Sequence, residues 1–348
     1  MKTPLIGLTA EQLRDVAVAA GAKPFAGKQI AKWIYERRAT SIDAMTDLSL
    51  AVRERLKESY TVGRREPIGK AVSTDGTVKY LFAGVGGRDI EAVYIPDRDR
   101  ATLCVSSQAG CRMGCKFCMT GRYGLQGNLT AGDIINQVLS VDGSEELTNI
   151  VFMGMGEPLD NIDAVMTAIE ILTASWGLAW SPKRITVSSI GRLKELARLL
   201  RETKVHIAIS LHVPFSDERR RLMPVEAAYP ITDVVALLRQ EDWSHQRRLS
   251  FEYIMWRDVN DSLRYAAALA KLIGGMECRV NLIRFHAIPD SDLRPASRPT
   301  MEAFRDYLSA RGITTTIRAS RGEDIMAACG MLAGGADKPE SADTAPLS

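Results

Sequence analysis

Residues 102–121 read TLCVSSQAGCRMGCKFCMTG, a strand-like run that leads into a glycine-containing loop with three cysteines. From here to about residue 320, short runs rich in β-branched residues alternate with longer amphipathic runs. Such alternation predicts a parallel sheet whose strands are joined by crossover helices. We therefore expect an α/β fold, a partial (β/α)6 TIM-like barrel, with the chemistry at the C-terminal ends of its strands.

The barrel pattern occupies residues 100–332, and the segments on either side differ from it. Residues 1–65 contain three amphipathic stretches, which predict a helical accessory domain. Residues 66–99 hold glycine-containing turn signals between short runs of β-branched and aromatic residues, which predict a β-hairpin extension. Residues 333–348 are small, polar and proline-containing, so we expect a disordered tail.

Composition limits the possible classes of protein. Apolar residues make up 46% of the 348 residues and charged residues 25%, which is ordinary for a globular protein. No apolar run approaches the roughly 18 residues of a membrane span. Glu11, Arg14 and Asp15 interrupt the stretch that a signal peptide would need to keep apolar. We expect a cytoplasmic protein that does not act at a membrane.

The positive charge is concentrated at the N-terminus. The net charge is +3, and residues 1–66 alone hold twelve Lys or Arg against eight Asp or Glu. A basic accessory segment could attract phosphate groups. A solvated helical surface with some extra Lys and Arg explains the same excess equally well.

The cysteines are unevenly spaced, with four of the six inside fifteen residues. In a cytosolic protein this crowding indicates metal or redox chemistry rather than disulfides. Cys111, Cys115 and Cys118 can bind a 4Fe-4S cluster, because thiolates are its usual ligands and three of them leave one iron open. Two alternatives are a buried helix face and a structural zinc site with Cys104 as the fourth ligand.

The three-cysteine spacing, with Phe117 before the last cysteine, resembles the radical SAM superfamily, in which S-adenosylmethionine binds the open iron. Further segments resemble the RlmN/Cfr family of RNA adenosine methyltransferases, and the run as a whole is most similar to the RlmN branch. These segments are TLCVSSQAGC (102–111), CKFCMTG (115–121), FMGMGEP (152–158), ITVSSIG (185–191), SLH (210–212), RLMP (221–224), NLIRF (281–285) and RASRGEDIMAACG (318–330).

The resemblance implies an S-adenosylmethionine-dependent RNA (adenine-C2)-methyltransferase acting on adenosine in 23S rRNA and tRNA. Methylation at C8, as in the Cfr branch, stays open because both branches share the same cysteines. Two rivals need no such activity: a radical SAM activase, and a non-catalytic, metal-stabilised RNA-binding protein. The implied partners are the two RNAs and an external electron donor such as flavodoxin, and we expect a monomer.

The resemblance also implies a role for individual residues. Cys329 carries the methyl group, Cys104 is the second redox cysteine and Glu91 is the proton acceptor. From the residues alone, Cys329 among alanines is a buried structural thiol and Glu91 an exposed strand residue. The cluster ligands are Cys111, Cys115 and Cys118, and the residues implied to bind the cofactor are Gly156, Glu157, Ser188, Ser210, Leu211, His212 and Asn281.

The implied enzyme holds one 4Fe-4S cluster and uses two S-adenosylmethionine molecules per turnover. The implied reaction ends with a disulfide between Cys104 and Cys329. RNA of this kind is recognised largely through phosphates and exposed loops. Two basic groups are therefore candidate docking surfaces. The first group is Lys28, Lys32, Arg37 and Arg38, and the second is Arg219, Arg220 and Arg221.

The chain departs from the family pattern in a few places. Met331 stands where the family commonly has Gln, and Arg284 and His286 stand where many relatives have Pro and Asn. These changes affect the rim of the expected site and remove none of its proposed catalytic groups. Cys278 has no counterpart in the motifs and is interpreted as a core residue.

Overall fold

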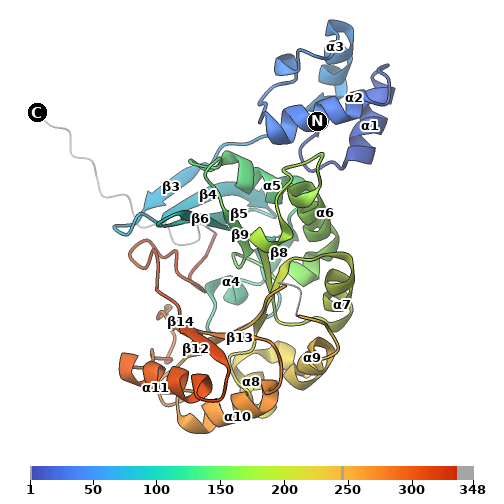
Figure 1. The fold of residues 1–348 in the computed structure, drawn as a ribbon. Coiled ribbons are helices and arrows are strands. Elements are labelled where there is room, and N and C mark those ends of the chain that lie inside the picture. The colour runs from blue at the N-terminus through green and yellow to red at the C-terminus, as the bar shows by residue number, and fades with distance from the viewer. Residues whose placement is uncertain (1, 244–246, 335–348) are drawn as a thin grey trace, which may run out of the picture.

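The computed structural model describes residues 2–243 and 247–334, and a curved sheet of parallel strands lies at its centre (Figure 1). The strands pair in the order β14-β13-β12-β11-β10-β9-β6, so each later strand adds to one edge. The fold class predicted from the alternating pattern is confirmed. The parallel strands are β6 (Arg100–Cys104), β9 (Asn149–Phe152), β10 (Ile185–Ser189), β11 (His206–Ser210), β12 (Leu249–Met255), β13 (Arg279–Arg284) and β14 (Thr314–Ile317).

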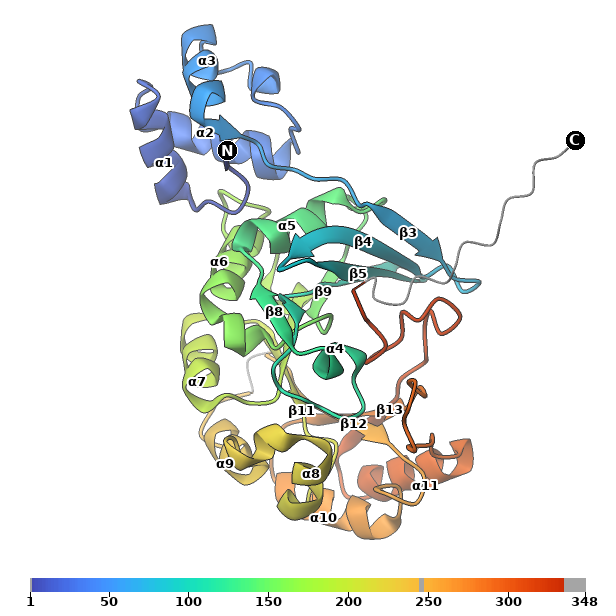
Figure 2. The same ribbon diagram turned by 180° about the vertical axis from the view of Figure 1, so that it is seen from behind.

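Crossover helices form an arc along the outside of this sheet (Figure 2). In α7 the leucines at 196, 199 and 200 are buried, which is the spacing of one helix face against the sheet. Strand β12 is buried at every position, as expected for a parallel strand covered on both faces. The crossover helices are α5 (Ala131–Ser140), α6 (Ile162–Thr173), α7 (Leu193–Glu202), α9 (Ile231–Leu238), α10 (Leu263–Ile273) and α11 (Arg298–Ser309).

The β-extension continues the barrel sheet instead of standing apart from it. Strand β5 (Arg88–Asp97) pairs antiparallel with β6, and β4 (Val78–Val85) and β3 (Gly69–Val72) follow outward. In this register Val93 lies opposite Cys104. The barrel edge and the extension therefore share one face, which carries side chains from both.

The N-terminal segment is helical, and the structure adds a short strand pair to the expected helices (Figure 1). The side chain of Thr9 accepts from the Gln12 backbone amide and completes a capping box at the first helix. The elements are β1 (Thr3–Pro4), α1 (Ala10–Ala19), α2 (Ala26–Ala31), the π-helix η1 (Lys32–Glu36), the 3-10 helix η2 (Ile42–Ala44), α3 (Leu50–Ser59) and β2 (Tyr60–Thr61).

This segment is fastened to the barrel through α5. Arg65 and Asn136 exchange two hydrogen bonds of 2.8 and 2.9 Å. A Cβ on Gly7 would come within 2.2 Å of the Gly132 backbone nitrogen, so the two backbones touch here. Arg38, predicted as an RNA-docking residue, instead donates to the Ser144 side chain and, at 3.1 Å, to its carbonyl. It is half-buried at the junction and is not a free docking group.

Several short elements complete the described chain. None of its helices is long and apolar enough to cross a membrane. Ala333 and Gly334, which begin the tail expected to be disordered, are hydrogen-bonded to Glu91, and residues 335–348 lie outside the described residues. The remaining elements are β7 (Gln108–Gly110), α4 (Met119–Arg122), β8 (Leu125–Asn128), η3 (Pro158–Asn161), η4 (Pro182–Arg184), α8 (Ser216–Leu222) and η5 (Pro224–Ala227).

The prediction of the second docking group is wrong for Arg219, its first residue. Arg219 is fully buried and forms an ion pair with Glu226, which is also fully buried. Its guanidinium also donates to the carbonyls of Leu211 (2.9 Å) and Ser210 (2.8 Å). The run of three arginines on α8 carries no sequence signal that shows which of them points inward. Only Arg220 and Arg221 of this group are exposed.

Replacing Arg219 with Met should lower the free energy of unfolding by about 3–5 kcal/mol, because Glu226 is then left as an unpaired buried charge. The double variant Arg219→Met/Glu226→Gln should recover a large part of this loss. Denaturant unfolding of the metal-free protein measures both values, with the exposed neighbour Arg220→Met as a control expected within about 0.5 kcal/mol of wild type. A loss under about 1 kcal/mol for Arg219→Met would contradict the role of this pair.

Candidate active site

The three predicted cluster ligands lie in one loop at the C-terminal end of the barrel's first strand. Cys111 directly follows β7, and Cys118 is the residue before α4. Figure 2 shows α4 inside the arc of crossover helices. Arg112 anchors the loop through a 2.8 Å ion pair with Asp160, a buried carboxylate that also pairs with Arg192. The loop is therefore held to the segment that follows β9.

Aromatic packing supports the same loop from beneath. The ring of Phe117 lies edge-on to His212, with 5.1 Å between centroids, and 4.9 Å from Trp256. Burial lowers the pKa of His212 to about 3, so its imidazole is neutral at physiological pH. Its Nδ1 accepts from the Ile254 amide at 3.1 Å. His212 is thus a buried, packed residue whose neutral ring is held in place, and its environment does not favour a role as general base.

The electrostatics of the three thiols favour a bound cationic group. Burial raises the pKa of Cys111 to about 12 and that of Cys115 well above its usual range, and charge on the neighbouring thiols adds to both effects. Burial also raises the pKa of Cys118. Crowded thiols of this kind lose their protons readily only when positive charge, such as iron, is placed among them.

The zinc alternative and the cluster place different demands on the three thiols. In residues 2–243 and 247–334, no three His, Cys, Asp or Glu side chains surround a single point as one metal ion requires. In a 4Fe-4S cluster each cysteine binds its own iron, so the ligand sulfurs stand farther apart. The metal and sulfide content of the protein distinguishes the two.

Cys104 and Cys329 lie near each other on the side of the sheet facing this loop. Burial, with a smaller contribution from Cys329, raises the pKa of the Cys104 thiol to about 12. Burial likewise raises the pKa of Cys329 to about 11, and the Arg318 guanidinium acts in the opposite direction. Taken as whole residues, Cys329 is exposed and Cys104 is buried. Both are free thiols here, and the implied disulfide is not formed in this state.

Arg318 links this pair to the barrel and was not singled out from the sequence. Its guanidinium lies 3.6 Å from the Met153 sulfur, and the Met153 amide donates to Cys104. It also pairs at 3.4 Å with Glu252, a buried carboxylate on β12. Arg318 is the first residue of RASRGEDIMAACG (318–330), one of the segments that resemble the family. Its place in that segment was the only sequence signal for it.

Glu91 is buried, so its interpretation from the strand pattern as an exposed residue is wrong. One carboxylate oxygen lies 3.1 Å from the Lys79 ammonium. The other accepts from the backbone amides of Ala333 (2.8 Å) and Gly334 (3.1 Å). Three donors therefore fix the orientation of this buried carboxylate. The pattern missed this because the covering residues come from the far end of the chain.

Polar contacts with the extension help to hold the segment that carries Cys329, in which Ala327 and Leu332 also pack in the main core. The Gly322 amide donates to Asp75 at 3.0 Å, and Asp324 accepts from Ser73 at 2.5 Å and from the Thr74 amide at 3.0 Å. These partners sit in the turn between β3 and β4. The hairpin turn therefore fixes where the Cys329 segment crosses the sheet.

Two further contacts connect the same segment to the barrel. Glu323 accepts from His286 at 2.8 Å and pairs with Arg284 at 3.6 Å. The Met119 amide donates to the Gly330 carbonyl at 2.8 Å, which joins the cysteine loop to the residue after Cys329. Two of the three departures from the family pattern, Arg284 and His286, thus hold the Cys329 segment through the Glu323 carboxylate.

The residues predicted to hold the cofactor begin at the end of β9. Gly156 has a φ of +101°, and a Cβ there would lie 2.6 Å from that of Gln108, so the turn requires glycine. Glu157 accepts from the amides of Leu159 and Ile190, each at 3.0 Å, and burial raises its pKa to about 7. An ammonium group brought beside it would favour the charged carboxylate.

The other predicted cofactor residues lie on or directly after the next strands: Ser188 and Ser210 at or beside the ends of β10 and β11, and Asn281 in the middle of β13. Ser188, Ser210 and Asn281 are half-buried, whereas Leu211 is fully buried and offers its carbonyl to Arg219. The Asn281 amide donates to Glu252 and accepts from Thr316, both at 2.8 Å. Three of these side chains therefore lie on the strands, while Leu211 and His212 support them from within.

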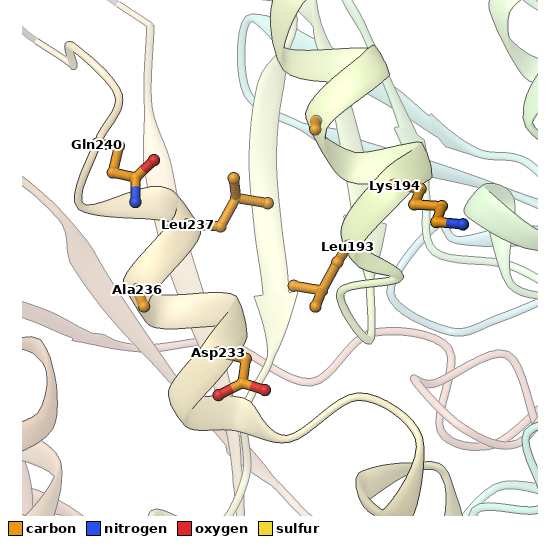
Figure 3. Close-up of a pocket in the computed structure, with 7 residues that line it drawn as sticks. Leu193, Lys194, Asp233, Ala236, Leu237 and Gln240 are labelled. Atoms are coloured by element: carbon orange, nitrogen blue, oxygen red, sulfur yellow. The ribbon is translucent and has the colours of Figure 1, made fainter.

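A pocket on the outer surface lies away from these groups. Figure 3 shows it between α7 and α9, with Leu193 and Leu237 facing each other across it. It contains none of the predicted site residues. Cys278, interpreted as a core residue, packs half-buried against the main core, and burial raises its pKa to about 11. Neither feature belongs to the site.

Comparison with known families and proteins agrees with this geometry. Residues 3–62 match the ribosomal RNA large subunit methyltransferase N-terminal domain, and residues 105–269 match the radical SAM superfamily. A probable dual-specificity RNA methyltransferase RlmN of Bacteroides fragilis is 57% identical over 331 residues, covering 95% of this chain and 96% of the relative. The dual-specificity RNA methyltransferase RlmN of Syntrophotalea carbinolica is 42% identical, covering 95% and 89%.

A solved structure extends the similarity to the fold. A radical SAM methyltransferase from Sphaerobacter thermophilus superposes with a TM-score of 0.89 at 40% identity, covering 95% of this chain and 99% of that one. Sequence and structural similarity therefore both run through the accessory segment, the extension and the barrel.

Proposed function

The chain belongs to the RlmN family of the radical SAM superfamily, and from this premise we propose that it methylates C2 of adenosine in 23S rRNA and in tRNA. Its relatives are named dual-specificity RNA methyltransferases. One observation carries the proposal for this chain: Cys104, Cys329 and Glu91 gather beside a three-cysteine loop. A radical SAM activase would need only the loop.

The target carbon explains why radical chemistry is required. C2 of adenine is electron-poor and its hydrogen has negligible acidity, so an ordinary methyl transfer finds no nucleophile. When bound, the 4Fe-4S cluster and S-adenosylmethionine supply the methyl group and a carbon-centred radical, with two cofactor molecules used per turnover. Cys111, Cys115 and Cys118 would hold the cluster. The cofactor would be held by residues on or after the strands: Gly156, Glu157, Ser188, Ser210, Leu211, His212 and Asn281.

The two remote cysteines divide the remaining work. Cys329, an exposed residue, accepts the methyl group and presents its carbon to the adenine. Cys104 then attacks the Cys329 sulfur as a thiolate. The sulfur–carbon bond breaks with its electron pair on the carbon, which takes up a proton to complete the methyl group, and a disulfide remains. An external donor such as flavodoxin would restore the thiols. Both thiols are protonated at rest, and the Arg318 cation favours their thiolate forms when they act.

Glu91 is the group that receives the C2 proton. Its carboxylate lies under the segment that carries Cys329, through the amides of Ala333 and Gly334. A base at this point is close to the carbon that the segment delivers. The target adenine must leave its stack to reach both groups.

Nucleoside mass spectrometry tests the function directly. RNA from a strain lacking the enzyme, incubated with reconstituted protein, S-adenosylmethionine and a reductant, should yield 2-methyladenosine. The product should arise from both 23S rRNA and tRNA. Formation of 8-methyladenosine instead would favour the Cfr-type activity, and an absence of methylated adenosine would contradict the proposal.

The two cysteines should fail in different ways. Cys104→Ala should still form the thioether and retain RNA covalently at Cys329, because only release is blocked. Cys329→Ala should keep the cluster but give neither methylated RNA nor a covalent band. A denaturing gel of protein purified from cells separates the two outcomes. Structural cysteines would fail alike, and normal turnover of Cys104→Ala would disprove its assignment.

The exposed basic residues of the accessory segment are the proposed RNA-docking surface. Lys28, Lys32 and Arg37 are exposed, and Arg37 stacks 4.2 Å from the Trp33 ring. Replacing these three cations with Gln should weaken RNA binding and reduce the slope of log Kd against log salt by about one for each phosphate that the protein no longer neutralises. Filter binding across a salt series measures both.

The matched control is Arg220→Gln/Arg221→Gln, which removes exposed charge from α8. Arg38 is left unchanged because it bonds Ser144 at the junction. If the control loses affinity and the triple variant does not, the docking surface lies at α8 and not on the accessory segment.

A further inference from the structure

Lys79 is a half-buried lysine inside the candidate site that neither the motifs nor the mechanism above accounts for. It lies on β4, and its side chain is 19% exposed. Its ammonium lies 3.1 Å from a Glu91 carboxylate oxygen and donates to the Met326 carbonyl at 3.4 Å. It therefore contacts both the proposed base and the segment that carries Cys329.

Strand register explains why these groups meet. In the antiparallel pairing of β4 with β5, Leu81 lies opposite Glu91 and Lys79 opposite Val93. In the next pair Val93 lies opposite Cys104. Directly opposed residues, and residues two apart, point to the same face of a sheet. Lys79, Glu91 and Cys104 thus share one face because of the register.

We propose that Lys79 is a positioning residue of the methyl-transfer reaction, holding the Glu91 carboxylate in its orientation and tying it to the Cys329 segment through Met326. This inference rests on the proposed function. It adds a group that acts on the reaction through Glu91, the residue proposed to contact the C2 hydrogen.

A carboxylate that receives a proton from a particular carbon must be held in one orientation. The Lys79 ammonium binds one oxygen of Glu91, and two backbone amides bind the other. A carboxylate has about four acceptor positions, so three donors leave one open. When the C2–H bond breaks, its electron pair stays on the adduct and the proton goes to that open position.

The contact with Met326 gives Lys79 a second task. Met326 precedes Cys329 by three residues, in the segment that carries the methyl group. Because one ammonium binds the base and this segment, a shift of either changes the position of the other. Lys79 therefore sets the placement of the base relative to the carbon that Cys329 delivers.

The test compares Lys79→Met, which removes the charge but keeps the length, with Lys79→Arg, which keeps the charge. Lys79→Met should slow the formation of methylated adenosine by about 10- to 100-fold, less than the roughly 10²- to 10⁴-fold that a positioned general base supplies, because Lys79 acts only through that base. The cluster content should stay within about twofold of wild type. The extent of Cys329 methylation, measured by intact-protein mass spectrometry, should also stay within about twofold. RNA covalently bound at Cys329 should accumulate, because the thioether to the adenine forms but the C2 proton is not removed.

Lys79→Arg should recover a large part of the rate, and Lys70→Met is the matched control. Lys70 lies on the neighbouring strand β3 and pairs only at the surface with Asp142, at 3.1 Å. Its replacement should leave the rate of product formation unchanged. Glu91→Gln, run in parallel, should trap the same covalent species as Lys79→Met.

The outcomes separate the two proposals. If wild type forms no methylated adenosine, the proposed function itself fails. If wild type is active and Lys79→Met turns over normally, only the role of Lys79 is overturned. If Lys79→Met loses Cys329 methylation to the same extent as product, or if Lys79→Arg gives no recovery, Lys79 is merely structural and the proposal is wrong.

Discussion

Antiparallel pairing of β5 with β6 is the constraint on which the rest of the site depends. It adds the extension to the edge of a parallel barrel and sets a register in which Val93 faces Cys104. The Ser106 hydroxyl, just beyond β6, donates to the Glu91 carbonyl at 2.6 Å and secures the same junction. A slip of one residue would turn Glu91 to the opposite face. The position of the base relative to the cysteines is therefore a property of the sheet.

The segment that carries Cys329 is held in a different way from the barrel core. The barrel strands bury nearly continuous apolar runs. This segment buries only a few apolar residues, among them Ala327 and Leu332, and adds hydrogen bonds from carboxylates and backbone amides. Each such bond contributes only about 1 kcal/mol, so the position of the segment depends on many small contributions. The role proposed for Cys329, which would meet a cofactor, an RNA base and a second cysteine in turn, suits a segment held in this way.

The barrel, its helices and the three-cysteine loop were predictable because periodicity and spacing are local properties. The inward position of Arg219 was not, since three consecutive arginines on α8 have the same sequence signal and only packing shows which one pairs with Glu226. Glu91 and Lys79 also escaped the pattern. Their burial comes from residues about 240 positions away, which cover that face of the extension. The resemblance supplied Glu91, and only the structure supplied Lys79.

The site is built from two halves with different tasks. Residues at or after the ends of β9, β10 and β11, with Asn281 on β13, are proposed to bind the cofactor, and the extension with the C-terminal segment carries Glu91, Lys79 and Cys329. The cysteine loop joins the two halves, through Arg112 with Asp160 on one side and Met119 with Gly330 on the other. In the proposed reaction one loop would therefore hold both the group that forms the radical and the segment that accepts the methyl group.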